Sequence, residues 1–137
     1  MSSLCDLETG RKLVAEIRRL LASPWGGVHL VGVAGIGMAG LAVHLAARGF
    51  SVSGCDLSPN RVSDALPRMK VNVLKGHSPS HITADVRWVI KSTAVPDGNA
   101  EIVAARSAGV PVYPRGAVLP ALLAGRTSVA VSGTHGK

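Results

Sequence analysis

Apolar residues recur along the chain in two patterns, one helical and near the N-terminus, the other in short continuous runs. Between residues 7 and 22 the leucine, valine and isoleucine positions share one helix face, and Pro24 with Gly26 marks the end of that helix. The short apolar runs predict strands at 28–33, 51–55, 71–76, 87–92, 110–113 and 127–133. Helical patterns lie between them at 37–50, 58–66, 99–109 and 117–125.

The order of these elements predicts an α/β fold. The strands are apolar throughout rather than alternating, which is typical of a sheet buried on both faces. Strands that alternate with helices favour a Rossmann-like, doubly wound, mainly parallel sheet with flanking helices. We expect Ser58 to cap the helix of 58–66, with Pro59 at its first position. Residues 1–27 form a helical extension that covers a sheet edge or contacts a partner, and 28–132 form the main domain.

A glycine-rich stretch, "VGVAGIGMAGLA", follows the strand predicted at 28–33 and opens the next helix. It fits G-x-G-x-x-G in two registers: fully with Gly35, Gly37 and Gly40, or starting at Gly32 with Ala34 in the middle position. Glycines there let backbone N–H groups approach a phosphate, and the helix N-terminus adds partial positive charge. The alternative is that the glycines only allow the helix to pack tightly on the strand.

Asp56 ends the next predicted strand, 19 residues after Gly37. A carboxylate at that place commonly binds a ribose or a base in such folds, although it can also simply cap a turn. The loop and the acid together indicate a nucleotide site, and these residues do not distinguish NAD from a UDP-linked ligand.

Composition narrows the class of partner. The formal charge of +7 comes from basic residues scattered along the chain, so an anionic small ligand is expected and no nucleic acid. Cys5 and Cys55 are 50 positions apart without a CxxC or Cys/His motif, which predicts free thiols, a reducing cytoplasm and no metal site. The apolar stretch 28–47 holds four glycines and two histidines, so no membrane span is expected there. The N-terminus also lacks the features of a signal peptide.

Six blocks, in order, resemble the N-terminal domain of the Mur ligases, and in particular the branch that adds L-alanine. They are "HLVGVAGIGMAGLA", "VSGCDLS", the "GH" of 76–77, "STAVPDGNAEI", "AGVPVYPRGAVL" and "VAVSGTHGK", and they cover residues 29–137. The resemblance implies that this domain binds UDP-N-acetylmuramate, while a central domain binds ATP with Mg²⁺ and a third receives the amino acid. The whole enzyme would phosphorylate the muramoyl carboxylate, and the amine of alanine would then displace the phosphate.

The resemblance also implies the binding residues. Those expected to contact the UDP-sugar are Gly32, Gly35, Gly37, Met38, Ala39, Gly40, Asp56, His77, Ser92, Thr93, Ala94 and Arg115. Residues 133–137 match the start of the family's ATP loop through Gly133, Thr134, Gly136 and Lys137. The hydroxyl residue that follows the lysine in such a loop is absent, so we expect no catalytic residue, no bound cofactor and no activity of these 137 residues alone.

The chain departs from the family at three positions. Ala34 stands where a glycine is usual, which would place a methyl group near the phosphate; Ala117 replaces an acid found in many members, and Ala100 a proline. His29 and His44 are interpreted as packing or surface residues and Cys55 as a core thiol. Two other functions remain open: an NAD(P)-binding domain of an oxidoreductase, and a non-catalytic regulatory or interaction module that uses the leading helix.

Overall fold

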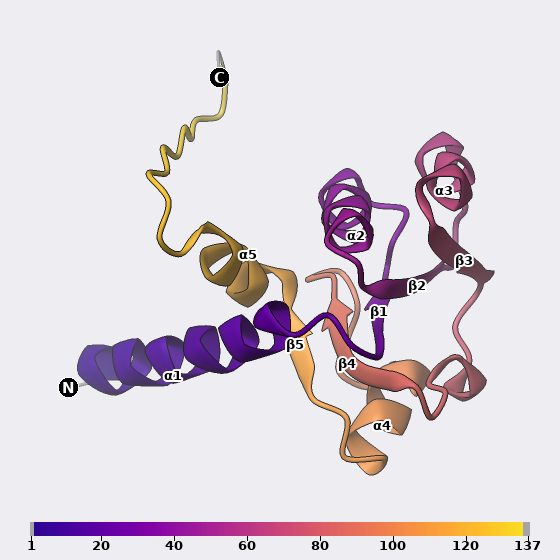
Figure 1. Cartoon of the computed structure of the whole chain (residues 1–137), viewed down its shortest axis with the longest axis horizontal. Helices are drawn as coiled ribbons and strands as arrows, with labels where there is room; N and C mark the ends of the chain where they lie inside the picture. Colours follow the sequence, from indigo (N-terminus) through magenta and orange to yellow (C-terminus); the bar gives the residue numbers. More distant parts are fainter. Residues whose placement is uncertain (1, 136–137) are drawn as a thin grey trace.

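A five-stranded, all-parallel sheet forms the centre of the protein. The computed structural model describes the backbone of residues 2–135 and the side chains of residues 7–135 (Figure 1). The strand order is β3-β2-β1-β4-β5. The chain thus places β2 and β3 on one side of β1, and then β4 and β5 on its other side. The strands are β1 (Gly27–Val31), β2 (Ser51–Asp56), β3 (Val71–Lys75), β4 (Val86–Lys91) and β5 (Val112–Pro114). This confirms the predicted Rossmann-like fold.

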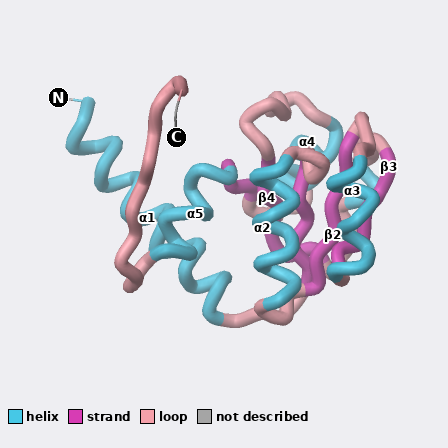
Figure 2. Tube along the Cα trace, turned by 90° about the horizontal axis from the view of Figure 1, so that it is seen from above, coloured by secondary structure: helices cyan, strands magenta, loops and turns pink. Residues whose placement is uncertain are grey.

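Helices cover both faces of the sheet. They are α1 (Ser2–Ala22), α2 (Ile36–Ala47), α3 (Arg61–Ala65), α4 (Ala100–Ser107) and α5 (Arg115–Leu123), with the 3₁₀ turns η1 (Leu66–Met69) and η2 (Pro79–His81). In Figure 1, α2 and α3 lie above the sheet and α4 lies below it, while Figure 2 shows α2 and α3 running along the strands. No helix among the described residues is long and apolar enough to cross a membrane.

Side chains of β1 alternate between two hydrophobic clusters, one on each face of the sheet. Val28 and Leu30 belong to the larger cluster, under α2, α5 and the C-terminal half of α1. Val31 belongs to the smaller cluster, under α4. Trp88 on β4 fills the larger core between Phe50 and Tyr113, with edge contacts of 6.1 Å between ring centroids. Burial on both faces is why these strands are apolar throughout.

The leading helix α1 covers the β5 side of the sheet through its C-terminal half. Its residues Ile17 and Leu21 are buried in the larger core. The hydroxyl of Tyr113 on β5 donates a 2.6 Å hydrogen bond to Glu16, and Arg48 reaches the carbonyl of Leu21. These contacts hold the C-terminal half of α1 against β5 and the larger core.

Two predicted details are wrong. Residues 127–133 are not a strand. They follow α5 and have no regular secondary structure, and Val129 is 87% exposed (Figures 1 and 2). An apolar run needs a neighbouring strand to form a ladder, and the described residues offer none to it. Ser58 does not cap α3 either, and α3 begins at Arg61 rather than at Pro59. Asn60 does, because it accepts hydrogen bonds from backbone N–H groups while Ser63 accepts one from the backbone N–H of Asn60.

We predict that Gly54→Ala destabilises the fold. A Cβ on Gly54 would lie 2.8 Å from the Cβ of Val33 and 3.1 Å from the carbonyl oxygen of Leu30, so β2 or the loop after β1 would have to shift. Overpacking of this kind costs about 1–3 kcal/mol in the free energy of unfolding, which urea denaturation measures. Gly98→Ala is the control, since a Cβ there meets nothing within 4 Å. Equal stability of the two variants would contradict the packing described here.

Candidate functional site

The glycine loop lies at the carboxyl end of β1, beside the loop that follows β4. Gly32 has a positive φ of 87°, and a Cβ built on it would lie 3.0 Å from the Cβ of Ser92. The absence of a side chain at Gly32 therefore lets the glycine loop approach the loop that follows β4. In doubly wound sheets, ligands bind at this crevice, where the strand order reverses.

Asp56 and Asn60 hold the glycine loop in place. The backbone N–H of Ala34 donates to Asp56 Oδ2 at 3.0 Å, and the Asn60 side-chain amide donates to the carbonyl of Ala34 at 3.1 Å. The other oxygen of Asp56 accepts from the backbone N–H of Ser58. Ala34 is only 5% exposed, so its methyl group packs into the core instead of standing at the loop surface. The loop is thus positioned by side chains from the end of β2 and the start of α3.

Positive charge gathers where α2 begins. Gly35 precedes α2 without a side-chain cap, and Ile36 and Gly37 are exposed at the helix start. The guanidinium of Arg115, the first residue of α5, lies so close that a Cβ on Gly37 would be 2.6 Å from its Nη1 atom. A helix N-terminus and a guanidinium both attract anions, and together they form a site suited to a phosphate group.

The other residues predicted to contact the UDP-sugar fall into two groups. Met38 and Ala39 are buried in the core, and their N–H groups donate to the carbonyl of Gly35, so they support α2 from within. Gly40 is exposed and lies in an apolar groove of about 380 Å³ between α2 and α5. Thr93 and Ala94 are exposed in the loop after β4. Contact of these residues with a ligand stays a prediction.

The predicted ATP-loop residues are only partly described. Gly133 and Thr134 are exposed and have no regular secondary structure, while Gly136 and Lys137 lie outside the described residues. Contact of this segment with ATP stays a prediction.

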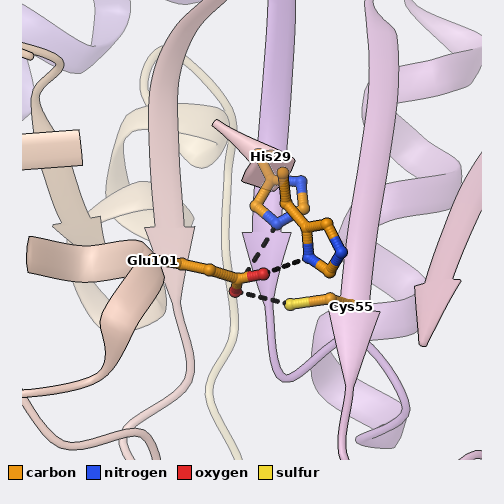
Figure 3. A group of neighbouring side chains, drawn as sticks. His29, Cys55 and Glu101 are labelled. Carbon is orange, nitrogen blue, oxygen red and sulfur yellow. Dashed lines mark hydrogen bonds and ion pairs between the residues drawn. The ribbon is translucent and has the colours of Figure 1, made fainter. Parts of the chain in front are cut away.

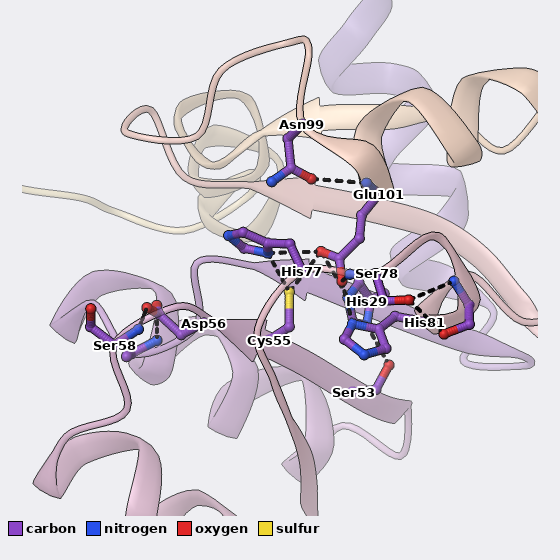
Figure 4. A network of polar contacts seen from close by, with 12 residues as sticks. His29, Ser53, Cys55, Asp56, Ser58, His77, Ser78, His81, Asn99 and Glu101 are labelled. Atoms are coloured by element: carbon purple, nitrogen blue, oxygen red, sulfur yellow. Dashed lines mark hydrogen bonds and ion pairs between the residues drawn. The ribbon is translucent and has the colours of Figure 1, made fainter.

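A second polar cluster lies on the opposite face of the sheet from α2, centred on the buried carboxylate of Glu101. Glu101 is the second residue of α4 and is 0% exposed, with its backbone N–H capped by Asn99. The Cys55 thiol donates to Glu101 Oε2 at 2.7 Å, and the backbone N–H of Ser78 donates to Oε1 at 3.2 Å. His81 Nδ1 also hydrogen-bonds Oε1. Figure 3 shows Cys55 on β2 and Glu101 on α4 pointing toward each other, and Figure 4 shows Ser78 and His81 beside them.

Two further histidines complete the cluster. His29 on β1 is 0% exposed, and its Nε2 atom lies 3.7 Å from Glu101 Oε2, beyond hydrogen-bond distance. The Nδ1 atom of His77 lies 3.2 Å from both Cys55 Sγ and Glu101 Oε2, and contact of His77 with a nucleotide stays a prediction. The positive φ of Gly76, 73°, turns the chain after β3 so that His77 approaches the cluster.

The cluster strongly perturbs two of its own groups. Burial raises the pKa of Glu101, but His29, Cys55 and the backbone N–H of Ser78 stabilise its ionised form more strongly, and its pKa falls to about 2. Burial, together with the neighbouring Glu101 carboxylate, raises the pKa of the Cys55 thiol far above its usual range. The cluster thus holds an ionised carboxylate at Glu101 and a neutral thiol at Cys55.

Motifs in the sequence do not predict this cluster. Its members come from four separate segments, and neither cysteine lies in a metal-binding motif, so the spacing predicts no metal site. The one available signal was His29, a polar residue within an otherwise apolar buried strand. Such a residue needs a buried partner, but nothing in the spacing identifies Glu101.

Comparison with known proteins relates the chain to one family. Residues 27–127 match the family described as "Mur ligase family, catalytic domain". The UDP-N-acetylmuramate–L-alanine ligase of Acidothermus cellulolyticus is 49% identical over 112 residues, which cover 82% of this chain and 23% of that protein. The ligase of the same name from Thiobacillus denitrificans is 42% identical over 110 residues, covering 80% of this chain and 24% of that protein.

Solved structures agree with this relationship. The UDP-N-acetylmuramate–alanine ligase of Thermotoga maritima matches with a TM-score of 0.67 and 33% identity, over 72% of this chain and 23% of that one. A ligase acting with UDP-N-acetylmuramate and a peptide, from Neisseria meningitides, shares the fold with a TM-score of 0.60 and 24% identity, over 66% of this chain and 29% of that one. The chain thus spans about a quarter of the length of the relatives it matches.

We predict that Asp56→Ala loosens the glycine loop. It removes the acceptor of the buried Ala34 N–H, and a buried donor left without a partner costs about 1–3 kcal/mol. Amide hydrogen exchange measured by NMR should therefore speed up at Ala34 and Ser58. Asp64→Ala, which removes an exposed carboxylate on α3, is the control and should leave exchange at Ala34 unchanged. Unchanged exchange in Asp56→Ala would show that this carboxylate does not hold the loop.

Proposed function

The chain belongs to the Mur ligase family, and we propose that it is the part of a UDP-N-acetylmuramate–L-alanine ligase that binds UDP-N-acetylmuramate. One observation carries this proposal: the open N-terminus of α2 beside the Arg115 guanidinium at Gly37. The diphosphate of a UDP-sugar is the part of the ligand that would use such a site, because it presents negative charge to backbone N–H groups and a guanidinium together.

The remaining parts of the ligand would occupy the neighbouring loops. Thr93 and Ala94 are exposed in the loop after β4, and Ser92 of the same loop approaches the glycine loop. We therefore expect the sugar, which is attached to the diphosphate, to contact Thr93 and Ala94. Asp56 would face the uridine. Its two oxygens each accept one backbone N–H, and a carboxylate oxygen can accept a second hydrogen bond, so holding the loop and contacting the ligand are compatible.

In the whole enzyme, this part would position the substrate rather than perform the chemistry. A carboxylate resists attack by an amine until its oxygen becomes a good leaving group, which ATP with Mg²⁺ provides by phosphorylating it. The amine of L-alanine would then form the amide and release phosphate. Gly133 and Thr134 would begin the ATP loop of a central domain, and none of the described residues is assigned a catalytic role.

We predict that the 137-residue chain binds UDP-N-acetylmuramate in a calorimetric titration and that Arg115→Ala weakens this binding. Hydrogen bonds to charged groups contribute about 1.5–3 kcal/mol, so the dissociation constant should rise by about tenfold or more. Arg106→Ala is the matched control, since Arg106 lies on α4 and pairs with Asp97 at an exposed position. Binding of NADH without binding of the UDP-sugar would instead favour an oxidoreductase domain and refute the proposal.

We further predict that Gly37→Val abolishes this binding. The branched side chain would occupy the position of the Arg115 guanidinium and stand between it and the start of α2. Titration with the same ligand tests this, and circular dichroism verifies that the variant is folded. Gly98→Ala is the control, because a Cβ there meets nothing within 4 Å. Wild-type affinity in a folded Gly37→Val protein would show that the ligand binds elsewhere.

A further inference from the structure

The polar cluster around Glu101 has the composition of a metal site. His29 on β1, Cys55 on β2, His81 on η2 and Glu101 on α4 each present one ligand atom, and all four atoms lie within 4.8 Å of one another. His29, Cys55 and Glu101 are buried, and the side chain of His81 is 13% exposed. The set contains one sulfur, two imidazole nitrogens and one carboxylate oxygen, a combination that suits tetrahedral Zn²⁺.

An independent observation shows that the hydrogen-bond network of the cluster is incomplete. The Nε2 atom of His29 is fully buried and has no hydrogen-bond partner. Its other nitrogen, Nδ1, lies 2.8 Å from the hydroxyl of Ser53. If Nδ1 donates, the Nε2 lone pair faces the Glu101 carboxylate, an acceptor; if the hydroxyl donates, the Nε2–H has no acceptor within reach. In the first case a cation between Nε2 and Glu101 satisfies both atoms, and the Ser53 contact fixes the tautomer that a metal requires.

The four ligand atoms are near enough for small shifts of the side chains to place them around one zinc ion. With bonds of about 2.0–2.3 Å, the ligand atoms of a tetrahedral zinc ion stand about 3.3–3.6 Å apart. The separation of His29 Nε2 and Glu101 Oε2 is 3.7 Å. The 2.7 Å between Cys55 Sγ and Glu101 Oε2 would open by about 0.8 Å when an ion replaces the shared proton.

The charges of such a site also balance. A thiolate and a carboxylate carry two negative charges, which Zn²⁺ cancels, while both imidazoles bind in their neutral form. A buried site of zero net charge avoids the cost of an isolated buried charge. Neighbouring groups would orient the ligands: Ser53 at His29, the Ser78 N–H at Glu101 and His77 beside Cys55.

We propose that His29, Cys55, His81 and Glu101 form a structural site for Zn²⁺ that joins β1, β2, η2 and α4 on the face of the sheet opposite α2. Four protein ligands leave no open position for substrate, so the site stabilises the fold and performs no chemistry. Binding proceeds by loss of the Cys55 thiol proton to solvent as the sulfur–metal bond forms, without any change of oxidation state.

Titration of the reduced, metal-free chain without a histidine tag tests this proposal, with Co²⁺ as the spectroscopic probe. One equivalent should produce a thiolate-to-cobalt charge-transfer band together with the intense visible bands of a tetrahedral site, and Zn²⁺ should abolish both. Cys55→Ser should eliminate the charge-transfer band. Cys5→Ser and His44→Asn, which change the other cysteine and an exposed histidine on α2, are the controls and should retain the full spectrum.

A second variant keeps the test decisive if Cys55→Ser does not fold. His81→Asn changes a partly exposed ligand on a short turn and should fold, while weakening Co²⁺ binding by about tenfold or more. Zn²⁺ at the same concentration should also raise the Tm of the wild type by more than that of His81→Asn. A cobalt spectrum without the charge-transfer band, or unchanged affinity in folded His81→Asn, would overturn the proposal and assign a proton to His29 Nε2. Neither result would affect the UDP-sugar proposal, which uses none of these four side chains.

Discussion

Burial of β1 on both faces is the constraint on which the rest of the structure depends. The strand pairs with β2 on one side and β4 on the other, so its backbone is fully occupied and only its side chains differ between the two faces. Val28 and Leu30 meet the larger core under α2, while His29 points into the α4 side. A buried imidazole at that position requires polar partners. The Ser53 hydroxyl is the partner of its Nδ1 atom, while its Nε2 atom faces the buried Glu101 carboxylate from 3.7 Å.

The same strand sets the position of the glycine loop. Because β1 ends at Val31, the positive φ of Gly32 turns the chain beneath Ser92 and leads it into α2. The N-terminus of α2 then lies within reach of Arg115, although 78 positions separate Gly37 from Arg115 along the chain. A parallel sheet produces this closeness, because it collects the carboxyl ends of β1, β4 and β5 at one edge.

Features predicted correctly from the sequence are those that local pattern determines. Short continuous apolar runs that alternate with helical segments correctly predicted five strands and their parallel arrangement. The sixth, at 127–133, failed because an apolar run indicates a strand only when a neighbour is present to pair with it. The cap at Ser58 failed for another reason: Asn60 and Ser63 form a reciprocal pair of hydrogen bonds, and Ser58 offers no equivalent.

The cluster around Glu101 could not be predicted because its members are brought together only by tertiary structure. The structure also connects it to the nucleotide-binding edge through a single residue. The carbonyl of Cys55 accepts the N–H groups of both Gly32 and Val33 at 2.9 Å, while its side chain points to Glu101. The next residue, Asp56, holds Ala34. Contacts that restrain the Cys55 side chain therefore also restrain the end of β2, which positions the glycine loop. Through this residue the cluster on the α4 face contacts the same strand end as the glycine loop.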